Sequence, residues 1–318
     1  MALLIDYFPY FAPYGDELLE LRVNLLRDTV DYFVISESDA THSGIRVELK
    51  FEQAAQKLDL PMDKIIYVKD HVPDDPEVLD IDRINTYQNQ WESAEQLLRS
   101  QQARARERQQ KDALMQIIHR FRDDDVFIVS DYDEIINPRE NWRYLADRCR
   151  AVSDRIYKLP FVFLETRADL RVHDRATGAP AHWSRSVYMA TKAHLQKANP
   201  NQIRSEVDIP FEIHHITENG KIIQDLGWHF SWMGGAAKRR VKIESYAHFQ
   251  DGFTWMPQEI FSSFQDPRYH AWNDQHQYAE GSMPPSGNVN QILKSYPRDN
   301  LPQVIINTPH LRKFFLNQ

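Results

Sequence analysis

The first 135 residues alternate short apolar runs with segments of helical spacing. The apolar runs have the length of buried strands and cover residues 3–8, 32–35, 65–68 and 126–129. Helices are predicted between these strands. One begins after Asp16, where leucines recur at helical spacing, and the others cover residues 51–58 and 86–120, which contain no Pro or Gly. This alternation predicts an α/β fold with a mostly parallel sheet and helices on both faces.

The second half of the chain has a less regular pattern. Residues 156–165 and 185–190 predict strands, and residues 237–249 predict a helix whose Lys238–Arg240 run we expect to be a solvated face. Because no Gly- or Ser-rich linker separates the halves, we expect one continuous domain over residues 1–318, with an irregular C-terminal half.

Ligands of such α/β folds bind outside the carboxyl ends of the strands. The polar residues that follow each predicted strand are therefore the first candidates for function. They are Asp6 and Tyr7, Glu37 and Ser38, Lys69 and Asp70, and Asp131 and Asp133.

Composition and charge exclude several classes of protein. The chain has 318 residues, with 38 Lys+Arg against 46 Asp+Glu, so that a net charge of −8 makes nucleic acid an unexpected partner. No apolar run approaches the roughly 18 residues of a transmembrane segment. A signal peptide would have Lys or Arg before its apolar segment. The apolar start of this chain has neither, so we expect a cytoplasmic protein. The single cysteine, Cys149, excludes an internal disulfide and is expected to be a structural or surface thiol.

The strongest local motif is FIVSDYDEI, residues 127–135. On an extended chain, Asp131 and Asp133 point to the same side, and their oxygens suit one divalent cation such as Mg²⁺ or Mn²⁺. The competing interpretation is an acidic turn after a strand. The run Asp123–Asp125 lies before the strand, at the wrong end for a ligand, and predicts a solvated turn.

Two further segments have the composition of binding loops. DLGWHFSWMGG, residues 225–235, combines Trp, His and Gly, although His229 is also compatible with a core histidine. RARERQQK, residues 104–111, places Arg106 and Gln110 on the helix that precedes the acidic strand. The alternative for that segment is a charged, solvated helix face.

Taken in chain order, these motifs resemble glycosyltransferase family 17, the family of the β-1,4-mannosyl-glycoprotein N-acetylglucosaminyltransferase. The matching pieces are IDYFP and ELLELR near the N-terminus, DYFVISES at 31–38 with Thr41 and Gly44, Arg106–Glu107 with Gln110, residues 125–135, and GWHFSW at 227–232. The resemblance implies a GT-A-like (Rossmann-like) fold, a UDP-sugar donor, most simply UDP-GlcNAc, and a D-x-D site for Mn²⁺ or Mg²⁺. Residues 1–135 would bind the donor and residues 136–318 a glycan or glycolipid acceptor.

The resemblance also assigns roles to individual residues. Asp131, Asp133 and His229 would hold the metal. The donor-site residues would be Asp6, Tyr7, Glu37, Thr41, Arg106, Gln110, Asp131 and Trp228. The sequence departs from the family at Lys111, where an arginine is expected.

The implied reaction is an inverting transfer, in which a carboxylate deprotonates the acceptor hydroxyl. Candidate bases are Asp225, Glu165 and Glu134, and candidate sugar platforms are Trp183, Trp228 and Trp232. One rival is a phosphatase or phosphotransferase of the haloacid dehalogenase type, which expects Thr or Val soon after the second aspartate, where this chain has Glu134. The other rival is a non-catalytic sugar-binding module on the same scaffold.

Overall fold

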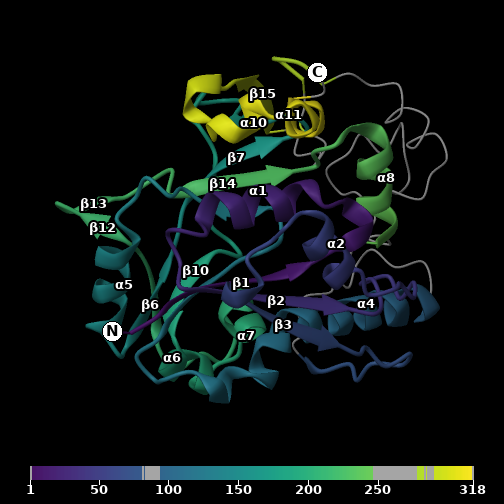
Figure 1. The fold of residues 1–318 in the computed structure, drawn as a ribbon, viewed down its shortest axis with the longest axis vertical. Coiled ribbons are helices and arrows are strands. Elements are labelled where there is room, and N and C mark those ends of the chain that lie inside the picture. Colours follow the sequence, from purple (N-terminus) through teal and green to yellow (C-terminus); the bar gives the residue numbers. More distant parts are fainter. Residues whose placement is uncertain are drawn as a thin grey trace.

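The computed structural model describes residues 2–80, 82, 94–245, 278–282, 284 and 290–316. These residues form a mixed α/β protein with two mixed sheets, one of seven strands and one of six (Figure 1). The α/β prediction is therefore confirmed, whereas the second sheet was not predicted. Within the described ranges, no helix combines the length and the apolar character that crossing a bilayer requires.

The seven-stranded sheet has the order β11-β6-β10-β4-β1-β2-β3. Its strands are β1 (Leu4–Tyr10), β2 (Tyr32–Ser38), β3 (Ile65–Asp70), β4 (Val126–Val129), β6 (Arg155–Lys158), β10 (Tyr188–Thr191) and β11 (Glu212–His215). β1, β2, β3 and β4 run parallel, as predicted, and β10 runs antiparallel to β4 and β6. The parallel part is thus confined to the first half of the chain and to the β6–β11 pair.

The second sheet has the order β15-β8-β7-β14-β5, with β9 paired to β7. Its strands are β5 (Glu134–Ile136), β7 (Phe161–Glu165), β8 (Leu170–Asp174), β9 (His182–Trp183), β14 (Gly227–Ser231) and β15 (Gln291–Ser295). The prediction of one strand over residues 156–165 is wrong, because β6 and β7 belong to different sheets. Pro160 separates them and has no N–H with which to continue a ladder.

Helices cover both faces of the first sheet, as predicted (Figure 1). α1 (Glu17–Leu26) and α2 (Phe51–Lys57) lie on the side of the second sheet; α4 (Ala94–Asp112), α6 (Lys192–Lys197) and α7 (Pro200–Ser205) lie on the other. α5 (Trp142–Arg150), α8 (Gly235–Ser245), α10 (Gln303–Asn307) and α11 (Pro309–Leu316) complete the α-helices of the described residues. The short 3₁₀ turns Ala113–Gln116 and Ile118–Arg120 follow α4, while residues 86–93 and 246–249 of the predicted helices lie outside the described residues.

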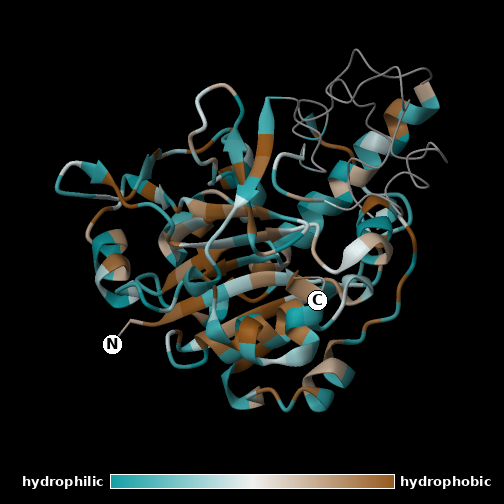
Figure 2. Ribbon diagram, turned by 90° about the horizontal axis from the view of Figure 1, so that it is seen from above, coloured by the Kyte–Doolittle hydropathy of each residue, from teal (hydrophilic) through white to brown (hydrophobic). Residues whose placement is uncertain are grey.

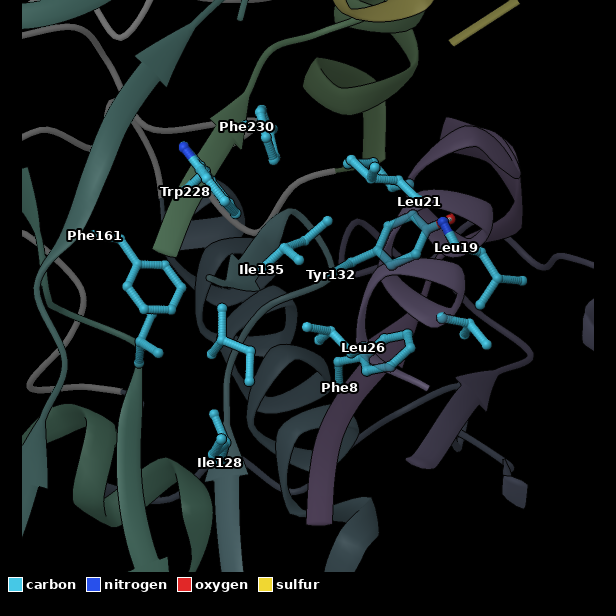
Figure 3. Packing of buried hydrophobic residues seen from close by; sticks show 14 of the residues in the cluster. Phe8, Leu19, Leu21, Leu26, Ile128, Tyr132, Ile135, Phe161, Trp228 and Phe230 are labelled. Carbon is cyan, nitrogen blue, oxygen red and sulfur yellow. Dashed lines mark hydrogen bonds between the residues drawn. The ribbon is translucent and has the colours of Figure 1, made fainter. Parts of the chain in front are cut away.

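The core follows the alternation of side chains along the strands. Leu4 and Phe8 of β1 face α1 and the second sheet, whereas Ile5 and Tyr7 face the opposite layer. Figure 3 shows part of the cluster around α1 and the second sheet, in which Phe8 lies close to Leu26 of α1 and to the ring of Tyr132. Hydrophobic colour is concentrated on the central strands (Figure 2). Cys149 is fully buried, and burial raises the pKa of its thiol to about 12, which confirms a structural thiol.

Candidate active site

The carboxyl ends of β1, β2 and β14 point toward the same side of the molecule, where α8 lies (Figure 1). β4 ends near this edge, and the chain turns at once into β5. The backbone N–H of Glu134 donates to the carbonyl of Asp131 at 3.1 Å, which closes that turn. The prediction that Asp131 and Asp133 occupy one extended stretch is therefore wrong. The turn sends the two carboxylates to different partners.

Asp133 contacts two basic side chains from the second half of the chain. Lys242 Nζ of α8 lies 2.7 Å from Oδ2, and His229 Nε2 of β14 lies 3.5 Å from Oδ1. The backbone N–H of Phe230 donates to the Asp133 carbonyl at 2.8 Å and ties the turn to β14. Burial alone would raise the pKa of Asp133, but the charges of Lys242 and His229 hold it well below its usual range. Asp133 is therefore ionised at neutral pH.

Asp131 belongs to a separate ionic network under the first sheet. Its Oδ1 accepts from the ammonium of Lys111 on α4, and Arg204 of α7 lies 3.8 Å from Oδ2. Arg204 also donates to Glu107 at 2.6 Å. Burial raises the pKa of Asp131, but Lys111 and Arg204 outweigh it and lower the pKa. The Lys111, Asp131 and Arg204 side chains line a narrow pocket together with Tyr7 and Tyr188.

Glu134 is buried behind this turn. Its carboxylate accepts hydrogen bonds from the backbone N–H of Asp131 at 2.5 Å, from the indole N–H of Trp183 and from the hydroxyl of Ser186. Burial, followed by the charge of Asp131, raises the pKa of Glu134. The three donors fix this carboxylate between the two sheets.

His229 lies in a cluster of aromatic rings and is 5% exposed. Its ring stacks on Phe163, with centroids 5.2 Å apart and planes at 9°, and lies 4.3 Å from the Trp183 ring. Nδ1 has no hydrogen-bond partner among the described residues. The β14 register places His229 opposite Glu134. The rings thus orient the imidazole with Nε2 toward Asp133.

Two of the three predicted metal ligands, Asp133 and His229, lie close enough together to bind one divalent cation. Oδ1 of Asp133 and Nε2 of His229 are 3.5 Å apart, a separation that ligands of one cation can have. Asp131 does not join them, and no group of three His, Cys, Asp or Glu in the described ranges could hold a metal ion. Mg²⁺ sites commonly use one or two protein carboxylates together with substrate phosphates. Asp133 and His229 therefore fit a cation whose remaining ligands come from a diphosphate.

The sequence from α1 to β6 is similar to a known family. Residues 14–158 match the sequence model of glycosyltransferase family 17. This segment is therefore similar to that family. None of the curated proteins matches the chain. The family 17 segment contains the acidic turn with Asp131 and Asp133, whereas His229 and Lys242 lie beyond it. The match indicates that this part of the chain is related to glycosyltransferases, which use a sugar donor and an acceptor.

Four of the predicted donor-site residues have protein partners that explain their burial. Asp6 pairs with Arg22, Tyr7 bonds to Ser36, Thr41 accepts from the backbone of Ile45, and Glu37 accepts from the N–H groups of Lys50 and Phe51 at the start of α2. The expectation that Asp6 and Tyr7 follow the first strand is wrong, because both lie within β1, and Glu37 lies within β2. Their contact with a donor stays a prediction.

Arg106 and Gln110 of the family 17 motif brace the loop after β2. Arg106 donates to the carbonyls of His42 and Asp74, and Gln110 donates to the carbonyl of Ala40 at 2.7 Å. The guanidinium of Arg106 also lies against Gly44, where a Cβ would be 3.0 Å from its Cζ. A side chain at position 44 would crowd this brace, and the positive φ of +94° there also favours glycine.

The remaining candidate residues lie in and around the second sheet. Asp225, whose side chain is 46% exposed, pairs with Arg171 at 3.0 Å and contacts His182 at 3.1 Å. Glu165 is fully buried at the end of β7. The predicted sugar platforms Trp228 and Trp232 are 5% and 6% exposed, and Figure 3 places Trp228 in the core beside Phe230.

Sequence reasoning missed three residues that contact the acidic turn of this family 17 segment. Lys242 was not singled out, Arg204 carried no motif, and Ser186 stood inside a predicted strand. The Lys238–Arg240 run was expected to be solvated, yet Arg239 is 4% exposed and lies over the Tyr278 ring at 5.1 Å. The position of α8 in the sequence could have indicated that its residues lie near the site, because this helix follows GWHFSW and a pair of glycines.

Proposed function

We propose that the chain is an inverting N-acetylglucosaminyltransferase of GT-A type, which transfers GlcNAc from UDP-GlcNAc to a hydroxyl of a glycan or glycolipid. The observation that carries this proposal is the approach of Asp133 to His229. The acidic residue comes from the family 17 motif and the histidine from the second sheet, and they meet where several strands end. Such a meeting point is where α/β folds bind their ligands.

The donor diphosphate would bind between the two carboxylate clusters. A Mn²⁺ or Mg²⁺ ion held there by Asp133 and His229 would stabilise the negative charge of the leaving diphosphate. Lys242 adds a positive charge beside Asp133, while Lys111 and Arg204 hold Asp131 at the wall of the narrow pocket. The rings of Phe163 and Trp183 pack against His229 and keep its imidazole oriented.

The acceptor hydroxyl needs a base on the face opposite the leaving group. Glu134 is occupied by three donors, and Glu165 is fully buried. Asp225 is the most accessible of the three candidate carboxylates, because its side chain is 46% exposed beside Arg171 and His182. We therefore place Asp225 first as the base, in the segment that directly precedes β14.

The family match weighs against the phosphatase reading, because it covers the acidic turn on which that reading depends. A non-catalytic sugar-binding module would keep the fold and lose turnover. Release of UDP distinguishes it from an enzyme.

The test is a thermal-shift panel of nucleotide sugars, with and without Mn²⁺, followed by a UDP-release assay. A ligand at 100 times its Kd stabilises the folded state by about 2.7 kcal/mol. We expect a Mn²⁺-dependent shift with UDP-GlcNAc that Asp133→Ala removes. Asp124→Ala is the matched control, because Asp124 is an exposed acid at the opposite end of β4. Absence of any shift with UDP-sugars in folded protein would refute the proposal.

A further inference from the structure

Lys242 lies in the last turn of α8, with its charged group between aromatic rings and acidic and polar side chains. Its ammonium lies 2.7 Å from Asp133 Oδ2 and 3.4 Å from Ser231 Oγ, and its side chain is 21% exposed. The same nitrogen lies 5.6 Å from the Tyr14 ring and 5.4 Å from the Trp232 ring. Two aromatic faces and a carboxylate therefore surround one positive charge.

The ammonium competes for the carboxylate that a metal would need. Asp133 presents one oxygen to Lys242 and the other to His229. A divalent cation bound to Asp133 would lie close to a like charge, and like charges at such distances repel strongly in a partly buried site. Metal binding and the Lys242–Asp133 pair therefore disfavour each other.

A diphosphate changes this balance. Lysine is a compact charge on a flexible stem, with three N–H donors that suit phosphate oxygens. When an anionic diphosphate enters beside Asp133, it offers Lys242 a second acceptor and offers the metal additional ligands. Trp232, Gly234 and Gly235 all have positive φ values, which reverse the chain between β14 and α8 and bring Lys242 back over the site.

We propose that Lys242 is the resident cation of the nucleotide-free site, and that a nucleoside diphosphate draws it away from Asp133 and thereby creates the metal site. The inference rests on the proposed function, since it assumes that Asp133 and His229 take a divalent cation. It predicts that metal and nucleotide each strengthen the binding of the other, because such coupling is reciprocal.

The experiment measures Mn²⁺ binding to the purified protein by the EPR signal of free Mn²⁺, with no nucleotide and with saturating UDP. The variants are Lys242→Met, which removes the charge at similar length, and Lys242→Arg, which keeps it. Lys238→Met is the matched control, because Lys238 lies on the same helix and its ammonium is 3.5 Å from the carbonyl of Pro13. Circular dichroism melting verifies that each variant is folded.

Without UDP, Lys242→Met should bind Mn²⁺ at least about tenfold more tightly than the wild type, a difference of about 1.4 kcal/mol. The strengthening of Mn²⁺ binding by UDP should shrink in this variant, while Lys242→Arg and Lys238→Met should behave as the wild type does. Equal Mn²⁺ affinities of wild type and Lys242→Met without UDP, both strengthened by UDP, would overturn this inference and leave the proposed function standing. If neither protein binds Mn²⁺ even with UDP, the metal part of the proposed function fails as well.

Discussion

Arg22 of α1 donates from Nη1 to the backbone carbonyl of Asp131 at 2.8 Å. Its Nε and Nη2 also donate to the carboxylate of Asp6 at 2.8 and 2.6 Å, and both side chains are fully buried. One guanidinium therefore connects α1, β1 and the acidic turn. Asp6, which was predicted to contact the sugar donor, therefore stabilises the acidic turn through its pair with Arg22.

Replacing Arg22 should destabilise the protein strongly. Arg22→Met leaves the Asp6 carboxylate buried without its partner, and breaking a buried pair in this way costs about 3–5 kcal/mol. Urea unfolding measures the loss. Arg143→Met is the control, because the Arg143–Asp31 pair is equally well aligned at 2.7 Å but exposed. Exposed pairs contribute about 0–1 kcal/mol, and similar losses in both variants would contradict the role of Arg22.

The two aspartates of the D-x-D motif should differ in function. Asp133 faces His229 and Lys242, whereas Asp131 faces Lys111 and Arg204. Asp133→Asn should abolish Mn²⁺ binding in the presence of UDP. Asp131→Asn should keep Mn²⁺ binding and weaken UDP binding, as calorimetric titration of each ligand can measure. Equal loss of Mn²⁺ binding in both variants would contradict the divergence of the two side chains.

The parallel strands were predictable because their residues are apolar on both faces. Residues 126–129 match β4 from end to end, and 65–68 lie within β3. The acidic turn was not predictable from the period of two that an extended strand implies. The sequence shows two acids one residue apart, but only the hydrogen bond from Glu134 to Asp131 reveals that the chain has turned between them.

The second half of the site depends on contacts between distant parts of the chain. His229 reaches Asp133 because β14 pairs antiparallel with β5, and no local pattern in either segment specifies that register. Lys242 lies near a run of basic residues, which on a helix usually marks a solvated face. Its place over Asp133 follows from the chain reversal at Trp232 and the two glycines.

The three candidate bases can be distinguished by kinetics. Asp225→Asn should lower kcat by about 10²–10⁴-fold, the usual contribution of a general base, with little change in UDP binding. Glu165→Gln and Glu134→Gln should keep kcat far closer to that of the wild type. If kcat falls with Glu165→Gln or Glu134→Gln and survives in Asp225→Asn, the base is not Asp225.

The pH profile gives a second readout for Asp225. Burial raises the pKa of Asp225, but the hydrogen bond from His182 and the charge of Arg171 outweigh it and hold the pKa below its ordinary value. Activity should therefore be lost only far into the acid range, as this carboxylate becomes protonated. Arg171→Met should move the acid limb of kcat toward higher pH, and an unmoved limb would contradict the assignment.

His42 should make the protein sensitive to mild acid. Burial is the main cause that lowers the pKa of His42 from 6.5 to about 4, with the charges of Lys111 and Arg204 acting in the same direction against Glu107. A histidine with a lowered pKa contributes stability above its unfolded pKa, and that stability is lost as the pH falls from about 6.5 to 4. Each pH unit between the two pKa values corresponds to about 1.4 kcal/mol.

As the pH falls, the free energy of unfolding of His42→Gln should decrease less than that of the wild type, by on the order of 2 kcal/mol. Urea unfolding at pH 7, 6, 5 and 4 measures it in wild type and variant. His71→Gln is the control, because His71 is an exposed histidine whose side chain is 74% accessible. Parallel pH curves for wild type and His42→Gln would contradict the burial of a neutral imidazole.

Gly227 should be required for the approach of β14 to β5. A Cβ at this position would lie 2.4 Å from the Ile135 carbonyl oxygen and 2.7 Å from Cζ of Phe161. The carbonyl belongs to the paired strand, so Gly227→Ala must push β14 away and move His229 relative to Asp133. Overpacking of this kind costs about 1–3 kcal/mol, and Mn²⁺ binding in the presence of UDP should weaken along with stability.

Gly220→Asn is the control, because Gly220 has nothing within 4 Å of a Cβ and its φ of +74° is one that asparagine tolerates. Unchanged Mn²⁺ binding in a destabilised Gly227→Ala protein would show that His229 does not depend on the β14–β5 register.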